Sequence, residues 1–327
     1  MKPNRILIVK LSSLGDLFHA LPAVHCLREQ LDAEIHWVTQ TEYAGLVGCF
    51  TDVSRIIVYN RRAPIRGFGA LWRELRAEKY DLVVDLQGLL KSALIARLAR
   101  AGRRIGPSFA REGSRLFYTS LAGPRQRNRH AVEENMDIVR YLGLNPTPPL
   151  FPVKFPEHKL DTPGPRIGLI PFSRWPSKNW PSANFAETCR RLRPETGGTF
   201  YLFGGGDDAA GCVAIAGQLP GAAVNLAGTT SLVETGSILK QMDLVIANDT
   251  GPMHMAAACG VPVLALFGPT DPKRTGPYGA RHRVLQSPLP CQPCRQRVCV
   301  RKEGDCLSAL PVSEVVETAL DMLGSRS

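Results

Sequence analysis

The sequence predicts an α/β protein made of two doubly wound domains. Short apolar runs alternate with amphipathic stretches along most of the chain, which is typical of βαβ units and a parallel sheet. Between residues 146 and 165 this alternation stops, and seven prolines fall within twenty residues, as in an inter-domain linker. With 327 residues, the chain is long enough for two domains that each bury a core.

In the first half, apolar runs predict strands and the stretches between them predict helices. We expect strands at residues 5–10, 34–39, 55–60, 81–87 and 103–106, and helices at residues 42–50, 68–79, 89–100 and 130–142. A further helix is expected to follow the loop at residues 11–16 and to reach residue 30. Pro22 lies inside that pattern and predicts a kink or a fresh helix start.

The second half repeats the alternation and ends in an amphipathic helix at residues 313–323. Its strands are expected at residues 166–172, 199–204, 223–227, 243–248, 261–267 and 281–286. We therefore predict an N-terminal domain at residues 1–150, a linker at 151–165 and a C-terminal domain at 166–310. The last segment, 311–327, carries a helix that could cross back to the first domain.

Positive charge is concentrated in one part of the chain. The formal net charge is +11, and nine arginines lie between residues 97 and 129 against one acid, Glu112. Such a field attracts the phosphates of a lipid, a nucleic acid or a substrate, with a solvated surface as the alternative. No apolar run reaches the roughly 18 residues of a membrane span, and the first run is too short for a signal peptide. We expect a cytoplasmic protein that meets an anionic membrane surface.

A strand, a turn and a helix around residues 243–260 carry the clearest chemical signal. Asp249 or Thr250 suits an N-cap, Gly251 lies in the turn, and Pro252 suits the first helical position. The unpaired N–H groups of such a helix start bind anions, most simply a phosphate. His254 lies one turn further and is expected to point to the same place. A capped helix without a ligand is the alternative.

Two other strand ends in the second half have compatible chemistry. Ser173 and Lys178 lie in the loop after its first strand, where a hydroxyl and a compact positive charge suit a diphosphate. Three glycines followed by Asp207 and Asp208 end the next strand, and those acids could accept hydrogen bonds from ribose hydroxyls. A solvated lysine and an ordinary turn are the alternatives. Together these loops suggest a nucleoside diphosphate site.

The first half offers a carboxylate and several polar groups at its strand ends. Ser13, Gly15 and Asp16 follow the first strand, and Asp16 is either a helix cap or a general base. An anionic acceptor could be held by residues after later strands, each of which is on its own more often a surface residue: Arg61, Arg62, Arg66, Gln87 and Lys91.

Several common nucleotide-binding patterns are missing. The sequence has no G-x-G-x-x-G after the first strand and no G-x-x-x-x-G-K-[ST], which argues against a dinucleotide dehydrogenase and a P-loop ATPase. It also has no Asp-x-Asp pair for a divalent metal, so Lys178 and the helix start would carry the charge of a leaving group.

Five motifs in order resemble the heptosyltransferases, glycosyltransferases of family 9. They are S-S-L-G-D, D-L-Q-G-L-L-K-S, S-K-N-W-P, N-D-T-G-P-M-H and G-P-T-D-P, and details of the second are most like heptosyltransferase I. The resemblance implies the GT-B fold and an inverting, metal-independent transfer of heptose from ADP-heptose to Kdo or an inner-core heptose of lipopolysaccharide. The donor is a substrate, so no cofactor is expected.

The resemblance also implies roles for individual residues. Asp16 would be the general base. The donor would be held by Ser173, Lys178, Asp207, Asp208, Asp249, Thr250, Gly251 and His254. The acceptor would be held by Ser13, Gly15, Arg61, Arg62, Gln87, Lys91 and Arg111. Position 174 is arginine, where the family often has a hydroxyl residue.

Cys291, Cys294, Cys299 and Cys306 form a cluster in sequence that these roles leave unexplained. The spacing would suit a tetrahedral zinc site, a pair of disulfides or four free thiols, and we assign no metal to it.

Two other functions are compatible with the sequence. One is a GT-B enzyme that uses a different sugar nucleotide. The other is a basic nucleic-acid-binding protein, although the arginine-rich segment lacks interleaved aromatic residues and matches no nucleic-acid module, so we expect no nucleic-acid partner.

Overall fold

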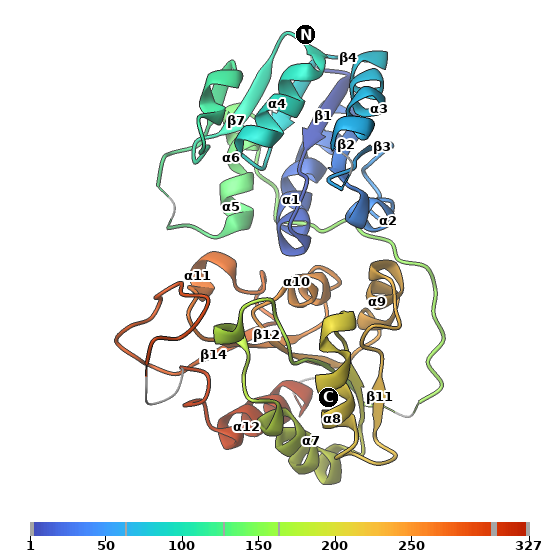
Figure 1. Ribbon diagram of the computed structural model, residues 1–327, viewed down its shortest axis with the longest axis vertical. Helices are drawn as coiled ribbons and strands as arrows, with labels where there is room; N and C mark the ends of the chain where they lie inside the picture. The colour runs from blue at the N-terminus through green and yellow to red at the C-terminus, as the bar shows by residue number, and fades with distance from the viewer. Residues whose placement is uncertain (1–2, 63, 127, 163, 302–305, 325–327) are drawn as a thin grey trace. The chain divides into compact units, whose positions relative to one another are not determined.

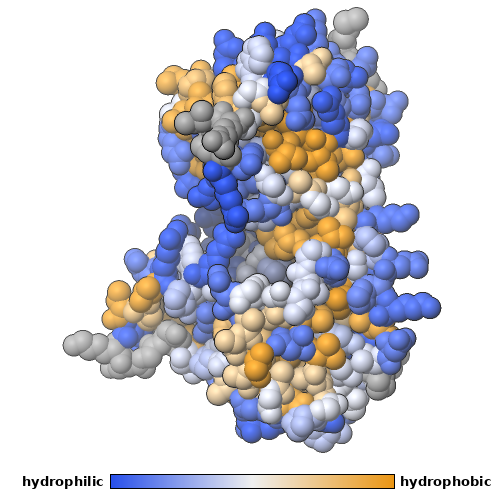
Figure 2. All heavy atoms as spheres, turned by 45° about the vertical axis from the view of Figure 1, so that its right-hand side comes forward, coloured by the Kyte–Doolittle hydropathy of each residue, from blue (hydrophilic) through white to orange (hydrophobic). Residues whose placement is uncertain are grey.

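The computed structural model describes residues 3–62, 64–126, 128–162, 164–301 and 306–324, with the backbone alone for residues 64–66. The chain divides into two compact units, Met1–Lys154 and Phe155–Ser327. Each unit is a parallel sheet with helices between its strands, as Figure 1 shows. On the face drawn in Figure 2, hydrophilic side chains alternate with residues of intermediate hydropathy, and apolar side chains gather in several patches. Among the described residues, no helix combines the length and the apolar character of a membrane span.

The first unit contains a six-stranded sheet in the order β3-β2-β1-β5-β7-β8, and all of its strand pairs are parallel. The strands are β1 (Arg5–Val9), β2 (Glu34–Gln40), β3 (Arg55–Tyr59), β5 (Leu82–Asp85), β7 (Arg104–Pro107) and β8 (Ser120–Ala122), with β4 (Lys79–Tyr80) and β6 (Arg100–Ala101) in a separate small sheet. The connections include α1 (Leu14–Leu31), η1 (Thr41–Tyr43), α2 (Ala44–Val47), α3 (Pro64–Ala77), α4 (Leu90–Leu98), η2 (Ser114–Phe117), α5 (Ala131–Asn135) and α6 (Asp137–Tyr141).

Three helix predictions in this unit need correction. Helix α1 is continuous from Leu14 to Leu31 with Pro22 inside, so the predicted fresh start does not occur. Most of this helix is buried, and burial of that much apolar surface outweighs one missing backbone hydrogen bond. The single helix predicted at residues 130–142 is two helices that meet at Met136, and the one predicted at 42–50 is η1 followed by one turn of α2.

The second unit has a six-stranded parallel sheet in the order β11-β10-β9-β12-β13-β14. Its strands are β9 (Arg166–Ile170), β10 (Thr199–Leu202), β11 (Ala223–Asn225), β12 (Leu244–Asn248), β13 (Val263–Phe267) and β14 (Arg283–Gln286). Its helices are η3 (Pro176–Lys178), α7 (Ser182–Thr196), η4 (Gly206–Asp208), α8 (Ala209–Ala216), α9 (Leu232–Leu239), α10 (Gly251–Ala258), α11 (Pro272–Thr275) and α12 (Val312–Gly324).

The C-terminal helix α12 belongs to the core of the second unit. Val315, Ala319 and Met322 are buried in the cluster that also contains Leu192 of α7 and Leu266 of β13. This apolar face is therefore covered within the second unit.

The proline-rich segment is anchored where it leaves the first unit and where it enters the second. Thr51 N–H donates to the Pro152 carbonyl at 3.1 Å, and Lys154 N–H donates to the Cys49 carbonyl at 2.8 Å. Phe155 is buried in the second unit, where Lys240 Nζ donates to its carbonyl at 3.1 Å. The boundary between the units, after Lys154, falls inside the predicted linker.

Candidate active site

Both sheets have the strand order of doubly wound nucleotide-binding folds. In such sheets the order reverses beside the first strand, and ligands bind outside the carboxyl ends of the two strands at that point. In the first unit these strands are β1 and β5, and in the second they are β9 and β12. Most of the residues predicted from the sequence lie in the loops that follow these four strands.

In the first unit, the loop after β1 is held by the loop after β5. Gln87 Oε1 accepts from the backbone N–H groups of Leu11 and Ser12, each at 3.2 Å. Lys10 is buried, and its Nζ donates to the Leu86 carbonyl at 2.6 Å. Gln87, predicted as an acceptor residue, therefore also fixes the backbone that leads to Asp16.

Asp16 lies in the first turn of α1 and is partly exposed. Its Oδ2 accepts from Ser13 N–H at 2.9 Å and from Ser13 Oγ at 2.8 Å. These bonds are the helix-capping interaction that we considered as the alternative to a role of Asp16 as a general base. They fix the carboxylate next to the start of α1. Gly15 is buried inside that first turn, because α1 begins at Leu14, within the loop expected at residues 11–16.

Asp85, at the end of β5, shapes the turn that carries Gln87. Its Oδ1 accepts from the N–H groups of Gln87 at 2.7 Å and Gly88 at 3.0 Å, and its Oδ2 accepts from Tyr118 Oη at 2.7 Å. Burial raises the pKa of the Asp85 carboxyl, and the hydrogen bond from Tyr118 opposes that shift. Burial, followed by the Asp85 charge, raises the pKa of Tyr118. No motif in the sequence indicated Tyr118, which lies 33 residues after Asp85.

Gly88 joins this turn to the arginine-rich segment. Its carbonyl accepts from Arg111 N–H at 2.8 Å and from Ser114 Oγ at 3.1 Å. Gly88 has φ = +70°, and a Cβ there would lie 2.7 Å from Pro107, so a side chain is excluded on both grounds. The backbone of Arg111 is thus tied to the loop that carries Gln87.

The remaining acceptor candidates lie near the surface. Arg61 and Arg62 are exposed after β3, and Lys91 places its Nζ 5.5 Å from the centre of the Tyr59 ring. The Arg66 side chain lies outside the described residues. Nothing in the described contacts assigns these residues to a ligand.

Not every arginine between 97 and 129 is available to a ligand. Arg104 donates to the carbonyls of Ala96 and Ala99, and Arg129 makes a two-pronged ion pair with the buried Asp137. Arg127 is outside the described residues. The exposed members are Arg97, Arg100, Arg103, Arg111 and Arg125, with Arg115 partly exposed.

In the second unit, Lys178 and Asp249 form an ion pair between the loops after β9 and β12. Lys178 Nζ lies 2.5 Å from Asp249 Oδ2, and their side chains are only 17% and 6% exposed. The same carboxylate oxygen accepts from Thr270 Oγ1 at 2.6 Å. The structure thus brings together two residues that were predicted separately and adds Thr270.

The amide of Asn248, the last residue of β12, holds this arrangement in place. It is fully buried, its Nδ2 donates to the Pro171 carbonyl at 2.6 Å, and its Oδ1 accepts from Trp180 N–H at 3.2 Å. Because both ends of the amide bond to the loop after β9, that loop is fixed relative to Asp249.

Helix α10 begins as the sequence predicts, with Thr250 at the N-cap, Gly251 and Pro252 in the first turn, and a buried His254.

The other predicted donor residues make local contacts in their own loops. Ser173 Oγ exchanges hydrogen bonds with the backbone of Trp175 two residues on. Asp208 accepts from Gly205 N–H at 2.8 Å and so caps η4, whereas Asp207 is exposed.

The four cysteines of the loop are free thiols in the structure. Among the described residues, the one group of three or more His, Cys, Asp or Glu with ligand atoms within 4.8 Å of one another is His25, Glu29 and Asp52. The described Sγ atoms of the four cysteines do not all lie within 4.8 Å of one another.

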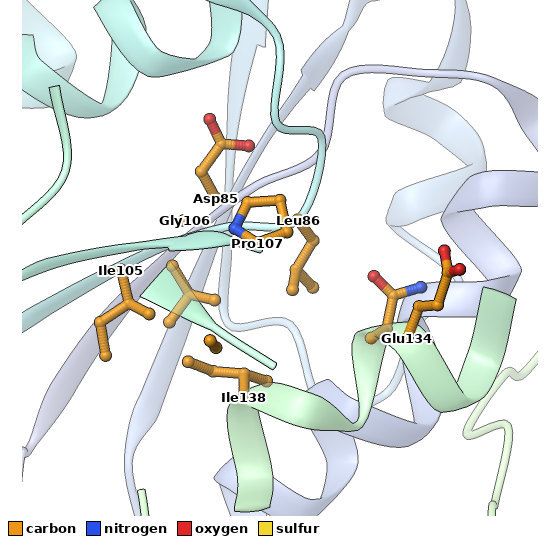
Figure 3. A pocket seen from close by; sticks show the side chains of 10 residues that line it. Asp85, Leu86, Ile105, Gly106, Pro107, Glu134 and Ile138 are labelled. Carbon is orange, nitrogen blue, oxygen red and sulfur yellow. The ribbon is translucent and has the colours of Figure 1, made fainter. Parts of the chain in front are cut away.

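A small cavity lies beside the turn at Asp85. Its volume is about 10 Å³, enough for one water molecule, and Asp85, Pro107, Glu134 and Ile138 are among the residues that line it. Figure 3 shows the Asp85 carboxylate pointing away from Ile138. The cavity is too small for a sugar.

Comparisons with known proteins identify the family. The model of glycosyltransferase family 9 (heptosyltransferase) matches residues 68–304. The lipopolysaccharide heptosyltransferase 1 of Pseudomonas aeruginosa is 32% identical over 318 residues, which cover 90% of this chain and 87% of that protein. The chain belongs to glycosyltransferase family 9.

Other family members support the same conclusion. The Escherichia coli K12 lipopolysaccharide heptosyltransferase 1 is 29% identical over 302 residues, covering 87% of this chain and 94% of that protein. The structure of E. coli heptosyltransferase WaaC with ADP is similar with a TM-score of 0.83 and 27% identity, covering 97% of this chain and 99% of that one. Like WaaC, this family 9 chain has the GT-B fold, and it is a glycosyltransferase.

Proposed function

We propose that this family 9 enzyme transfers heptose from ADP-heptose to a Kdo residue, or to an inner-core heptose, of lipopolysaccharide. The observation that carries the proposal is the 32% identity to a heptosyltransferase 1 over 90% of the chain, because it spans the loops of both units. The solved relatives with ADP and with ADP-2-deoxy-2-fluoro heptose support the choice of donor.

The second unit is proposed to bind the donor. The N–H groups at the start of α10 face the carboxyl edge of the sheet, where a diphosphate would be stabilised by the helix start and by Lys178. Thr250 and Gly251 provide that start, His254 lies one turn on, and Ser173 lies in the loop that Asn248 fixes. The exposed Asp207 is suited to the adenosine, and Asp208 shapes its turn.

The first unit is proposed to bind the acceptor and to supply the base. Asp16 takes the proton from the acceptor hydroxyl as its oxygen attacks the anomeric carbon, and ADP leaves from the opposite face, so the configuration inverts. One carboxylate oxygen already accepts two hydrogen bonds from Ser13, and those bonds orient the group. Positive charge from Arg61, Arg62, Lys91 and Arg111, together with the Gln87 amide, would complement an acidic acceptor.

We also propose that the enzyme works at the cytoplasmic face of an anionic membrane. Helices α3 and α4 contact each other and expose Phe68, Trp72, Leu90 and Leu94, while Arg97 lies at the end of α4. We call Phe68, Trp72, Leu90 and Leu94 the α3–α4 surface. Apolar side chains beside arginines are typical of proteins that bind the headgroup region.

The transfer itself can be tested directly. The purified enzyme is incubated with ADP-heptose and Kdo-lipid A, and ADP release and the product mass are followed. We expect ADP and a product heavier by one heptose. ADP-glucose and UDP-GlcNAc serve as competing donors, and turnover of either with none of ADP-heptose would refute the proposed donor.

A further inference from the structure

The loop at residues 287–301, which we call the cysteine loop, carries Cys291, Cys294 and Cys299 and packs against the loops after β9 and β13 of the second unit. Ser177 Oγ donates to the Gln296 carbonyl at 2.6 Å, and Ser177 N–H donates to the Arg297 carbonyl at 3.3 Å. On the other side, Arg295 N–H donates to the Pro269 carbonyl at 2.8 Å. The loop therefore has a defined position beside Lys178 and Thr270.

Arg297 and Lys178 lie over the same aromatic ring. The Lys178 Nζ is 4.7 Å from the centre of a Trp175 ring, and the Arg297 Cζ is 5.4 Å from the centre of a Trp175 ring. Both distances are within the range of a cation–π interaction, about 6 Å. Trp175, a residue to which the sequence assigned no role, thus keeps two positive charges close together.

The charge balance at this place favours a second cation. Lys178 is neutralised by Asp249 in a nearly buried pair, so the two together contribute little net charge to a ligand. A nucleoside diphosphate carries at least two negative charges. Arg297 is exposed and, among the residues that the structure describes, makes no ion pair. Its planar guanidinium suits phosphate oxygens in a two-pronged contact.

We propose that the cysteine loop is part of the donor site and that Arg297 binds the diphosphate of the donor, with Trp175 positioning both Arg297 and Lys178. This inference rests on the proposed function. It also gives the loop at residues 287–301 a role: its backbone presents Arg297 through the hydrogen bonds of Ser177.

The test is titration calorimetry with ADP. We expect Arg297→Ala to weaken ADP binding about tenfold or more, because a charge-assisted hydrogen bond to phosphate is lost. Arg297→Lys should restore part of the affinity. Arg295→Ala, which changes another exposed arginine of the same loop, should bind like the wild type. Melting curves establish that the variants are folded, and the KM for the acceptor should not change.

Two outcomes separate this inference from the proposed function. If the wild type binds ADP and Arg297→Ala binds it equally well, the role of Arg297 is refuted and the donor assignment stands. If the wild type does not bind ADP, the proposed donor is refuted. A titration with inorganic pyrophosphate then tests the role of Arg297 independently of the nucleoside. Weaker pyrophosphate binding by Arg297→Ala than by the wild type supports Arg297 as a diphosphate ligand. Equal binding by the two proteins, or binding by neither, overturns this role.

Discussion

At the scale of single residues, the main candidates serve the fold as well as the proposed chemistry. Asp16 caps α1, and Gln87 accepts hydrogen bonds from the loop after β1. Asp249 forms an ion pair with Lys178 and accepts a hydrogen bond from Thr270. Motifs in the sequence identified Asp16, Gln87, Lys178 and Asp249. The contact between Lys178 and Trp175 could not be identified in this way, and neither could Tyr118, the partner of Asp85, which lies in a segment without a recognisable motif.

Lys178→Ala is expected to weaken ADP binding by at least about tenfold. The variant loses a cation and leaves Asp249 as an uncompensated carboxylate that repels the diphosphate. The measurement is again ADP titration, with the exposed Lys159 changed to alanine as a control. Wild-type affinity in Lys178→Ala would place the lysine outside the donor site.

At the scale of elements, the doubly wound fold class and most element positions could be predicted, whereas breaks within helices could not. Apolar periodicity located the long strands because each is buried on both faces. It failed at Pro22, where packing keeps α1 continuous, and at Met136, where the apolar pattern runs through a change of helix. Nor could the pattern predict that the cysteine loop packs against the loops after β9 and β13, because those contacts are hydrogen bonds to backbone carbonyls.

The turn after β5 is expected to depend on Tyr118. Tyr118→Phe removes one hydrogen bond from the buried Asp85 carboxylate and should lower the free energy of unfolding by roughly 1–3 kcal/mol. Urea denaturation measures this change. Tyr141→Phe, which alters an exposed tyrosine, is the matched control, and an equal effect of both changes would contradict the role of Tyr118.

The connection between β13 and β14 should be sensitive to acid. Burial lowers the pKa of His282 to about 4 from its ordinary 6.5, and Nδ1 accepts from Val263 N–H at 3.2 Å. The folded state holds His282 neutral, whereas the unfolded state takes up a proton below pH 6.5. The contribution of neutral His282 to the free energy of unfolding is therefore complete above pH 6.5 and is lost as the pH falls toward 4. The loss should total about 3 kcal/mol.

Urea denaturation at pH 7, 5 and 4 tests this contribution, with His282→Asn as the comparison. The asparagine Oδ1 can accept from Val263 N–H but does not titrate in this range. The wild type should lose more stability than the variant as the pH falls, and parallel losses would show that His282 does not titrate as described.

At the scale of the whole molecule, the enzyme is expected to bind anionic vesicles through the α3–α4 surface. The exposed apolar side chains can insert into the headgroup region of the membrane. Each arginine near an anionic membrane surface adds about 1 kcal/mol to the binding free energy. In co-sedimentation, Leu90→Ser with Leu94→Ser should bind phosphatidylglycerol vesicles less than the wild type. Val213→Ser, at an exposed apolar position of the second unit, is the control.

The central claim is that the first unit supplies the general base and the second unit binds the donor. It is tested most directly by measuring the turnover number and the ADP dissociation constant of Asp16→Asn side by side. Asparagine can still accept the hydrogen bonds from Ser13 but cannot act as a base. We expect turnover to fall by about 10²-fold or more with unchanged ADP affinity. Turnover close to that of the wild type would contradict this account.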